Sequence, residues 1–344
     1  MIITLFLFII CAVAICKNAS KSLSEKQKFT DIVKFVTALF VVNGHLFVFG
    51  GGPHSWAQEM NIGPLCVSLF FFLSGYGLMC SYERKGAAYF KGFLSHRLGR
   101  VIFPLITAYI VTLPVYRIVV GEIDWHTVFS TFYWGGPFLR FSWYVTEIVL
   151  LYLFFYVIMR SSVSKQHKIY ILTFLILLVM GVLIATKQPI WYIESLPAFM
   201  IGFWFQRYEK IICNEFLIGR GKKIGVVILL SLVLLITFHW HFVAKYIQVL
   251  SAFRYQYVSY YIMNIVFVIL IIIAMKGVEI HITFPSALTN SYYEIYLMQN
   301  CSMLALRDVT SSFPVYWLGV MLLTVVLAVL MHKGNSLLMK NLKI

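Results

Sequence analysis

Charged residues are scarce in this sequence. Asp, Glu, Lys and Arg make up 12% of the 344 residues, whereas soluble domains usually carry about 25%. Hydrophobic residues account for 61% of the chain. A chain of this composition has too little polar surface to cover its apolar side chains in water. We therefore exclude an ordinary soluble domain and predict a polytopic membrane protein.

Three further absences argue against other classes of protein. The six cysteines include no C-x-x-C pair, so neither a disulfide framework nor a metal site is expected. The sequence shows no internal repeat of the kind found in many transporters. The longest connection between apolar runs has about 22 residues (121–142), which leaves no room for an additional soluble domain.

The apolar residues gather in eleven runs that approach the length needed to cross a bilayer. The first run lacks the basic region that precedes the apolar core of a signal peptide, so we expect it to be an uncleaved span. We predict an all-α, polytopic transmembrane helix bundle of about 10–11 spans, with a hydrophobic segment and basic linker at 1–29 and one membrane domain at 30–344. The runs lie at about 1–16, 31–49, 64–81, 99–120, 143–159, 169–186, 190–206, 224–243, 256–275, 290–306 and 314–331.

Lysine and arginine alternate between the two sides of these runs. Every second connection, together with Lys34 and Arg100 at helix starts, holds 22 of the 28 basic residues. Basic residues concentrate on the cytoplasmic side of membrane proteins, so we expect a cytoplasmic C-terminus. The net charge of +15 is then a signal of topology, and no nucleic-acid partner is expected. We predict a multi-pass protein of the cell membrane, surrounded by membrane lipid.

The apolar run 31–49 carries ionisable side chains at membrane depth. Lys34 and His45 are eleven residues apart, which is about 16 Å of helix rise and about 20° beyond three full turns. Both side chains therefore leave the same face, with the cation near the cytoplasmic surface and the imidazole further inside. Ionisable residues in this position are usually functional or paired within a bundle.

His45 is our candidate general base, because a neutral imidazole can take a proton from an attacking hydroxyl. The alternative is a histidine that only forms a hydrogen bond inside the bundle. Asp31 lies about four turns away on the same helix, too far to orient the ring. An orienting carboxylate must come from elsewhere, and the intramembrane candidates are Glu147 and Glu294.

Two arginines stand at the start of a span in a basic cytoplasmic segment. Arg97 and Arg100 are three residues apart and would be neighbours on a helix. Guanidinium groups match phosphate oxygens bidentately, which favours a phosphate clamp. Ordinary positive-inside anchoring gives the same pattern, and spacing alone does not separate the two interpretations.

Small residues interrupt the apolar run 64–81. Ser74, Gly75 and Gly77 follow four bulky residues and let another helix or a ligand approach the backbone closely. Helix packing is the favoured interpretation.

Two further runs hold polar or aromatic residues in an apolar setting. Trp143 and Tyr144 are either aromatics of the membrane interface or part of a binding site. Glu147, one turn further in, should face the bundle interior. Glu294 and Gln299 lie within the apolar segment 291–300, where a hydrogen bond between helices is the simplest role.

Taken in order, these stretches resemble the membrane acyltransferase-3 family, integral-membrane enzymes that O-acetylate cell-envelope glycans. The resemblance runs from about Thr30 to the C-terminus, and the order of the motifs is more specific than any single motif. Asp31, Lys34 and His45 match the opening Asp–Arg–His pattern, and Phe71 to Tyr76 match FF-x-LSG-aromatic. Arg97, Arg100 and Pro104 match Arg-x-x-Arg…Pro, and Trp143 and Tyr144 match Trp-Tyr. Residues 196–204 match LP-x-F-x-x-G, and residues 291–299 match SY-x-x-YL-x-H.

Two positions depart from the family pattern. Lys34 stands where arginine is usual, which keeps the charge and loses bidentate geometry. Gln299 replaces the late histidine, so this position cannot act as an acid or base. The chain resembles the stand-alone members that lack an extracytoplasmic hydrolase-like domain.

The resemblance implies acetyl-coenzyme A as the cytoplasmic donor and a sugar hydroxyl as the acceptor, with no metal. The acceptor is expected in a capsular or related surface polysaccharide, or in its lipid-linked precursor, at a bacterial plasma membrane. The resemblance and the residues together assign His45 and Glu147 to catalysis, Lys34, Arg97 and Arg100 to the coenzyme A phosphates, and Trp143 and Tyr144 to the acceptor.

Several alternatives stay open from the sequence. Transfer can be direct or pass through an acetyl-histidine intermediate. A transporter or flippase of a lipid-linked glycan would also be polytopic and aromatic, with buried charges, and an acyltransferase could act on a small-molecule acceptor. The sequence is compatible with a homo-oligomer and does not specify one.

Overall fold

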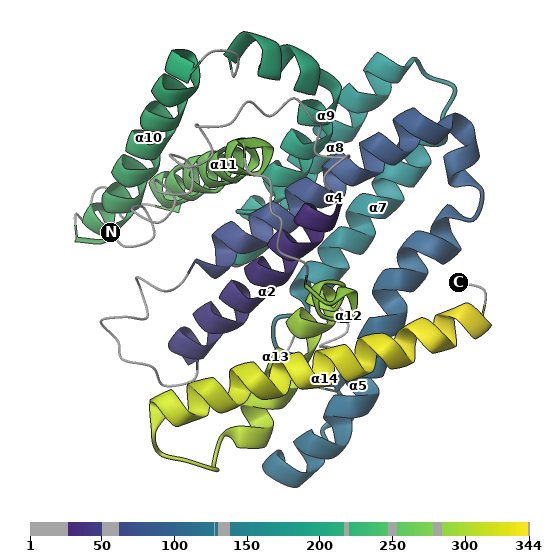
Figure 1. Cartoon of the computed structure of the whole chain (residues 1–344), viewed down its shortest axis with the longest axis vertical. Coiled ribbons are helices and arrows are strands. Elements are labelled where there is room, and N and C mark those ends of the chain that lie inside the picture. Colours follow the sequence, from purple (N-terminus) through teal and green to yellow (C-terminus); the bar gives the residue numbers. More distant parts are fainter. Residues whose placement is uncertain are drawn as a thin grey trace. The chain divides into compact units, whose positions relative to one another are not determined.

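The computed structural model describes residues 27–49, 62–126, 128–129, 138–216, 220–246, 253–277 and 284–342 (Figure 1). All regular secondary structure in these ranges is helical. Seven of the described helices are long and apolar enough to cross a membrane. The predicted all-α membrane bundle is therefore confirmed. The first predicted span, 1–16, and the centre of the predicted outer loop, 130–137, lie outside the described residues.

Each predicted apolar run within the described ranges forms a helix. The long helices are α2 (Gln27–Phe49), α4 (Gly63–Lys85), α5 (Gly99–Val120), α7 (Trp143–Arg160), α8 (Lys165–Ala185), α9 (Leu196–Phe216), α10 (Arg220–Tyr246), α11 (Phe253–Gly277), α13 (Tyr292–Leu306) and α14 (Phe313–Asn341). Shorter turns are η2 (Gly86–Phe90), η3 (Leu94–Leu98), η4 (Ile190–Tyr192) and α12 (Ser286–Thr289).

Two predicted spans differ from the structure in position or length. The run 190–206 was expected to be helical from its start, but η4 and a turn come first and α9 begins at Leu196. Pro197 explains this start, because proline fits the first turn of a helix, where its missing N–H costs nothing. Helix α13 has 15 residues, about 22 Å of rise, which is shorter than the roughly 30 Å hydrocarbon core.

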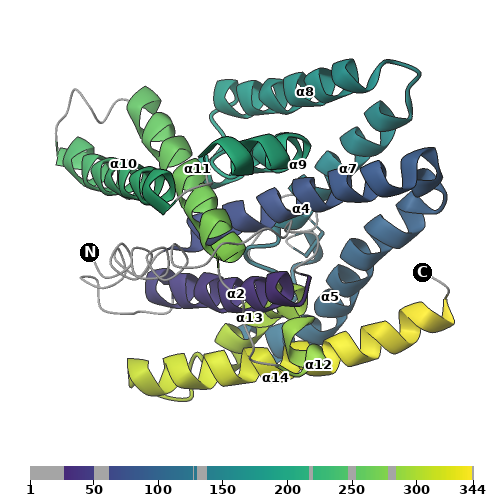
Figure 2. The ribbon, with the colours of Figure 1, turned by 45° about the horizontal axis from the view of Figure 1, so that its top comes forward.

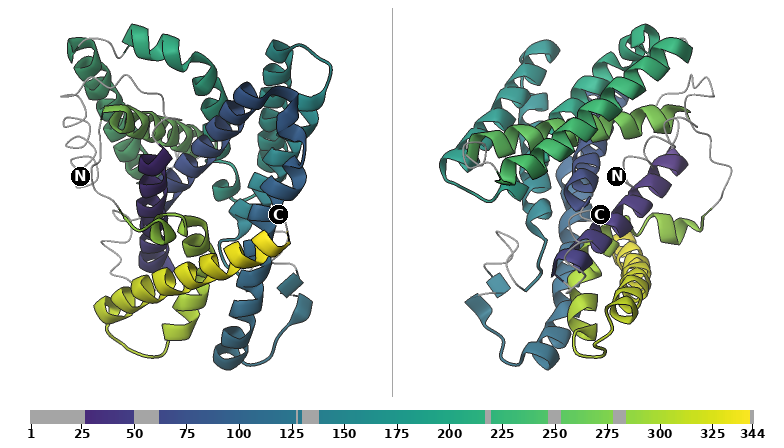
Figure 3. Two further views of the ribbon diagram at one scale, coloured as in Figure 1. Left: turned by 45° about the vertical axis from the view of Figure 1, so that its right-hand side comes forward. Right: turned by 90° about the vertical axis from the view of Figure 1, so that its left-hand side faces the viewer.

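The chain divides into two compact units. The described part of unit 1 contains α4, most of α8, and α9 to α11. The described part of unit 2 contains nearly all of α2, then α5, α7 and α12 to α14. Within unit 2, α13 packs against α5 and α14, and α14 (yellow) passes across α5 (blue) in Figure 3.

Helix directions in unit 2 agree with the topology expected from the basic residues. Lys34 near the start of α2 lies over the ring of Tyr292 at the start of α13, 5.0 Å from its centroid. Further along both helices, His45 bonds to Gln299. The helices α2 and α13 are therefore parallel, as the predicted inward-to-outward direction of both requires.

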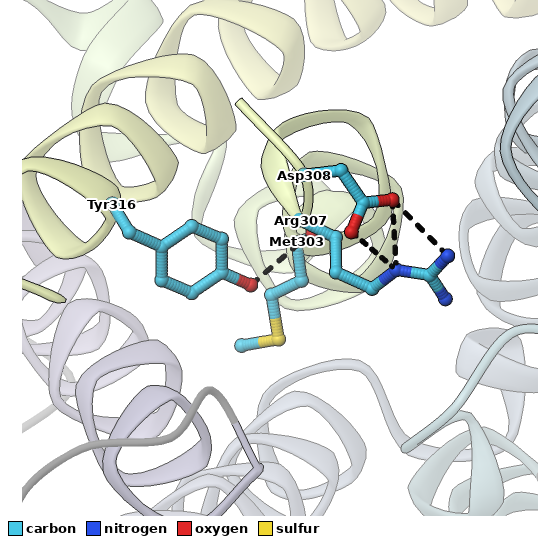
Figure 4. A network of polar contacts seen from close by, with 4 residues as sticks. All are labelled: Met303, Arg307, Asp308 and Tyr316. Atoms are coloured by element: carbon cyan, nitrogen blue, oxygen red, sulfur yellow. Dashed lines mark hydrogen bonds and ion pairs between the residues drawn. The ribbon is translucent and has the colours of Figure 1, made fainter. Parts of the chain in front are cut away.

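Helix α14 runs in the opposite direction to α13. Tyr316 near the start of α14 donates a hydrogen bond of 3.2 Å to the carbonyl of Met303, near the end of α13 (Figure 4). Late in α14, His332 Nδ1 lies 3.0 Å from a carboxylate oxygen of Glu294, at the start of α13. The two contacts at opposite ends fix an antiparallel pair.

In unit 1, α4 and α9 cross with their backbones in close contact (Figure 2). A Cβ atom on Gly75 would lie 2.3 Å from the carbonyl oxygen of Phe199, and one on Gly202 would lie 2.3 Å from the carbonyl oxygen of Phe72. Glycine is thus required at both positions. The predicted packing role of the small residues is supported for Gly75, whereas Gly77 has open space around its Cβ position.

Candidate active site

Gln299 fixes the orientation of the His45 ring. The Nδ1 atom of His45 lies 2.8 Å from Oε1 of Gln299, and Nε2 of Gln299 donates a 2.8 Å hydrogen bond to the carbonyl of Tyr296. A carbonyl can only accept, so the amide nitrogen must face Tyr296 and the amide oxygen must face the imidazole. In neutral His45, Nδ1 therefore carries the hydrogen and Nε2 carries the lone pair.

Phe141 covers one face of the His45 ring. The two ring centroids are 3.7 Å apart and the planes are nearly parallel, at 6°. Phe141 has a positive φ of 82°, which is rare for an aromatic residue. The Tyr296 hydroxyl donates a hydrogen bond to the Phe141 carbonyl, and Asn300 Nδ2 donates one of 3.0 Å to the Phe138 carbonyl. Helix α13 thus holds both the imidazole and the turn that stacks on it.

Lys34 lies at the other end of the same helix face. Its Nζ is 3.4 Å from Asp31 Oδ1, in a partly exposed ion pair, and 5.0 Å from the centroid of the Tyr292 ring. Both Lys34 and His45 therefore face α13, as their spacing predicts. The adjacent Tyr293 donates a 2.9 Å hydrogen bond to the carbonyl of Val101, at the start of α5. The first turn of α13 consequently joins the basic starts of α2 and α5.

Arg97 and Arg100 occupy different kinds of helix. Arg97 lies in η3, a π-helical turn, and Arg100 lies in the first turn of α5, which follows without a break. The two arginines thus lie in one continuous helical segment that begins with a wider π turn, and their role as a pair stays a prediction. Arg97 is half-buried and donates from Nε to the Tyr89 hydroxyl at 2.9 Å, whereas Arg100 is exposed.

The other predicted residues lie on α7 and α13. Glu147 is buried on α7, about one turn from the helix start. Trp143 begins α7, and Tyr144 packs edge-on against Tyr296, with centroids 5.5 Å apart. Glu294 bonds to His332. The roles of these side chains remain predictions.

An amide, not a carboxylate, stands at Nδ1 of His45. The expectation from the sequence named Glu147 and Glu294 as carboxylates that could orient the ring. Sequence reasoning missed Gln299 in this role, although the departure from histidine at this position was a signal that it faces the site. The contribution of Phe141 had no signal in the sequence.

We find no candidate metal centre in the part of the chain that the structure describes. There, His, Cys, Asp and Glu side chains form no group of three or more that could hold a metal ion. The described cysteines, at positions 66, 80, 213 and 301, are not in disulfides.

The family profile described as Acyltransferase domain (Acyl_transf_3) matches residues 27–333. This range contains all the helices above except part of the end of α14. The chain belongs to the acyltransferase-3 family. This acyltransferase is a multi-pass membrane protein. Comparison with curated proteins and with solved structures gave no match.

Proposed function

We propose that this acyltransferase transfers acetyl from cytoplasmic acetyl-coenzyme A to a sugar hydroxyl, with His45 as general base. The acceptor is a capsular or related surface polysaccharide, or its lipid-linked precursor, at a bacterial plasma membrane. The observation that carries the proposal is the hydrogen bond from His45 Nδ1 to Gln299, because it leaves the basic lone pair on Nε2.

The proposed transfer is a direct displacement. His45 Nε2 takes the proton of the acceptor hydroxyl while the hydroxyl oxygen attacks the thioester carbonyl carbon. The carbon–sulfur bond then breaks, and the proton passes from the imidazolium to the departing thiolate. Gln299 supports this step because its amide oxygen keeps a hydrogen bond to Nδ1–H when the ring becomes positive. Glu147 is the second residue that we assign to catalysis.

The donor is proposed to bind at the basic starts of α2 and α5. Lys34, Arg97 and Arg100 would contact the phosphates of coenzyme A, since guanidinium and ammonium groups pair with phosphate oxygens. Tyr292 and Tyr293 support this assignment, because they connect Lys34 with the start of α5. The pantetheine arm then spans about 16 Å along α2 to reach His45.

The acceptor is proposed to bind beside the turn that ends at α7. Trp143 and Tyr144 offer aromatic faces, which suit the apolar faces of sugar rings. Tyr144 packs against Tyr296, whose hydroxyl bonds to the carbonyl of Phe141. Through Tyr296, Tyr144 is thus linked to Phe141, the residue stacked on His45.

Mass spectrometry of the surface glycan from cells with and without the protein tests this function. We expect O-acetyl groups to disappear in the deletion strain and in cells that carry His45→Ala or Glu147→Gln. His167→Ala is the matched control, because His167 is an exposed histidine of the same unit. Polymer export should stay normal, and lost export with His45→Ala would instead identify a transporter.

The same strains separate the remaining chemical alternatives. If the glycan acetyl content is unchanged and the purified protein consumes acetyl-coenzyme A with a small amino sugar, the acceptor is a small molecule. Rapid-quench mass spectrometry of protein mixed with acetyl-coenzyme A alone should show unmodified His45. Acetyl trapped on that residue would replace direct transfer with a two-step route.

A further inference from the structure

Unit 1 contains a buried polar site where α4, α9 and α11 meet. Glu194 and Ser195 lie in the turn that leads into α9. Ser68 of α4 lies 3.0 Å from the Ser195 hydroxyl, and Asn264 of α11 donates a 3.2 Å hydrogen bond to the carbonyl of Glu194. The residues assigned to acyl transfer all belong to unit 2, so they are not part of this cluster.

Two oxygen atoms of this cluster are buried without a hydrogen-bond partner. Glu194 is 3% exposed and Asn264 is 1% exposed. Neither Oε2 of Glu194 nor Oδ1 of Asn264 has a partner among the described residues. Both atoms are acceptors, and burying either one unpaired costs free energy. A buried carboxylate with an unpaired oxygen is therefore a candidate for binding a cation that would neutralise it.

The two hydroxyl donors of the cluster already have acceptors. The side-chain amide of Asn264 donates one hydrogen bond to the Glu194 backbone carbonyl. The Ser68 hydroxyl lies within hydrogen-bond distance of Ser195 Oγ and of the Pro64 carbonyl, and the Ser195 hydroxyl lies 3.4 Å from the same carbonyl. Two hydroxyl protons are therefore committed to these acceptors. Glu194 also takes part in none of the ion pairs of the described residues.

We propose that Glu194 and Asn264 bind one small monovalent cation, either a proton or a sodium ion. A single positive charge would neutralise the one carboxylate, and a cation held between the two side chains would give both acceptor oxygens a partner. Oxygen ligands suit a hard cation. A divalent ion would leave a net charge in a buried site that has a single carboxylate, which is unfavourable.

The cation would stabilise the packing of α9 against its neighbours. It joins the turn before α9 to α11, while the serine pair joins the same turn to α4. Further along α9, its backbone contacts that of α4 so closely that Gly75 and Gly202 have no room for a Cβ atom. Loss of the cation would remove a link between the turn before α9 and α11, beside this close contact with α4. Tyr260 of α11 is a titratable side chain that interacts electrostatically with Glu194.

Thermal unfolding of the full chain in detergent tests the site without any need for activity. The protein is measured from pH 5.5 to 8.5, at 0 and 300 mM sodium chloride, with N-methyl-D-glucamine chloride holding ionic strength constant. A sodium site predicts that sodium raises the Tm of the native chain by roughly 5 °C at pH 8.5. A proton site predicts that the Tm falls as pH rises, whatever the sodium concentration, because the stabilising protonated form is lost.

Variants decide whether either response belongs to this cluster. Glu194→Gln keeps the shape, removes the charge and should abolish the response. Glu209→Gln is the matched control, since Glu209 is a buried carboxylate of the same unit that already has a cation, Lys276 at 2.6 Å. Glu209→Gln should have a lower Tm than the native chain, but its Tm should change with sodium or pH as that of the native chain does.

Asn264→Ala provides a second variant if Glu194→Gln does not fold. Loss of the amide oxygen should weaken the site. For a sodium site, the rise in Tm should then need a higher sodium concentration, and for a proton site, the fall in Tm should begin at a lower pH. The proposal is overturned if the native chain responds to neither cation, or if Glu194→Gln and Asn264→Ala respond as the native chain does. Failure here leaves the acetyltransferase proposal untouched, because the two use different residues and different measurements.

Discussion

Nδ1 of His45 and Oε1 of Gln299 lie 2.8 Å apart, although 254 positions separate the two residues in the sequence. The amide nitrogen of Gln299 is committed to the Tyr296 carbonyl, so the amide can present only its oxygen to the ring. A glutamine thereby sets the tautomer of the proposed base, a role more often given to a carboxylate.

Replacing Gln299 with leucine should lower kcat with little change in the KM for acetyl-coenzyme A. Leucine leaves Nδ1–H without an acceptor and no longer fixes the tautomer, so we expect a loss on the order of 10²-fold. Ser302→Ala is the control, because it removes a buried 3.2 Å side-chain-to-backbone bond from the same helix. Steady-state kinetics with purified protein measure both variants, and a normal kcat for Gln299→Leu would contradict the assigned role.

The hydroxyl of Tyr296 should matter for catalysis more than for folding. In Tyr296→Phe the carbonyl of Phe141 loses its donor, so the strained turn can relax and release the His45 face. We expect kcat to fall about fivefold to tenfold, which corresponds to the loss of one hydrogen bond.

Tyr316→Phe is the matched control for this change. Tyr316 also donates from a buried hydroxyl to a backbone carbonyl of α13, that of Met303, as Figure 4 shows. Both variants should lower the free energy of unfolding by about 1 kcal/mol. Equal kcat values in the two variants would mean that the Tyr296 bond is only structural.

The helices and the shared face of Lys34 and His45 could be predicted from the sequence, because both follow from regular periodicity. Apolar length sets the helices, and an 11-residue spacing returns to the same side of a helix. The π turn that holds Arg97 could not be predicted, since residue preferences do not distinguish one wide turn within a helical segment.

The partners of His45 were hidden for another reason. Gln299 and Phe141 meet the ring through tertiary contacts, and no local pattern encodes a contact between residues so distant in sequence. Phe141 is still harder to foresee, because aromatic residues seldom adopt positive φ. The start of α9 could have been predicted from Pro197, because proline favours the first turn of a helix. The predicted run 190–206 was based on hydropathy alone and therefore began too early.

Replacing both Arg97 and Arg100 with glutamine should raise the KM for acetyl-coenzyme A. Charged hydrogen bonds to phosphate contribute about 1.5–3 kcal/mol each, so a rise of at least about tenfold is expected. Arg100→Gln alone should leave the Tm unchanged because this side chain is exposed, whereas Arg97→Gln also breaks the bond to Tyr89.

Arg307→Gln is the control for the loss of positive charge. Arg307 is paired with the exposed Asp308 at 3.2 Å and lies in a connection expected on the outer side (Figure 4). The Arg307→Gln variant should have the same KM for acetyl-coenzyme A as the native chain. Unchanged donor dependence in the double arginine variant, with topology intact in a cysteine-labelling assay, would reduce the two arginines to membrane anchors.

The tight crossing of α4 and α9 predicts opposite effects for two glycines that stand two residues apart. Gly75→Ala places a Cβ atom 2.3 Å from the Phe199 carbonyl oxygen, and forcing the backbones apart should cost about 1–3 kcal/mol or more. Gly77→Ala adds the same atom to the same helix with nothing within 4 Å, so it should stabilise the helix by about 0.5–1 kcal/mol. Thermal unfolding in detergent should therefore place the Tm of Gly75→Ala below that of the native chain and the Tm of Gly77→Ala at or above it. Similar values for the two variants would show that α4 and α9 are not in backbone contact.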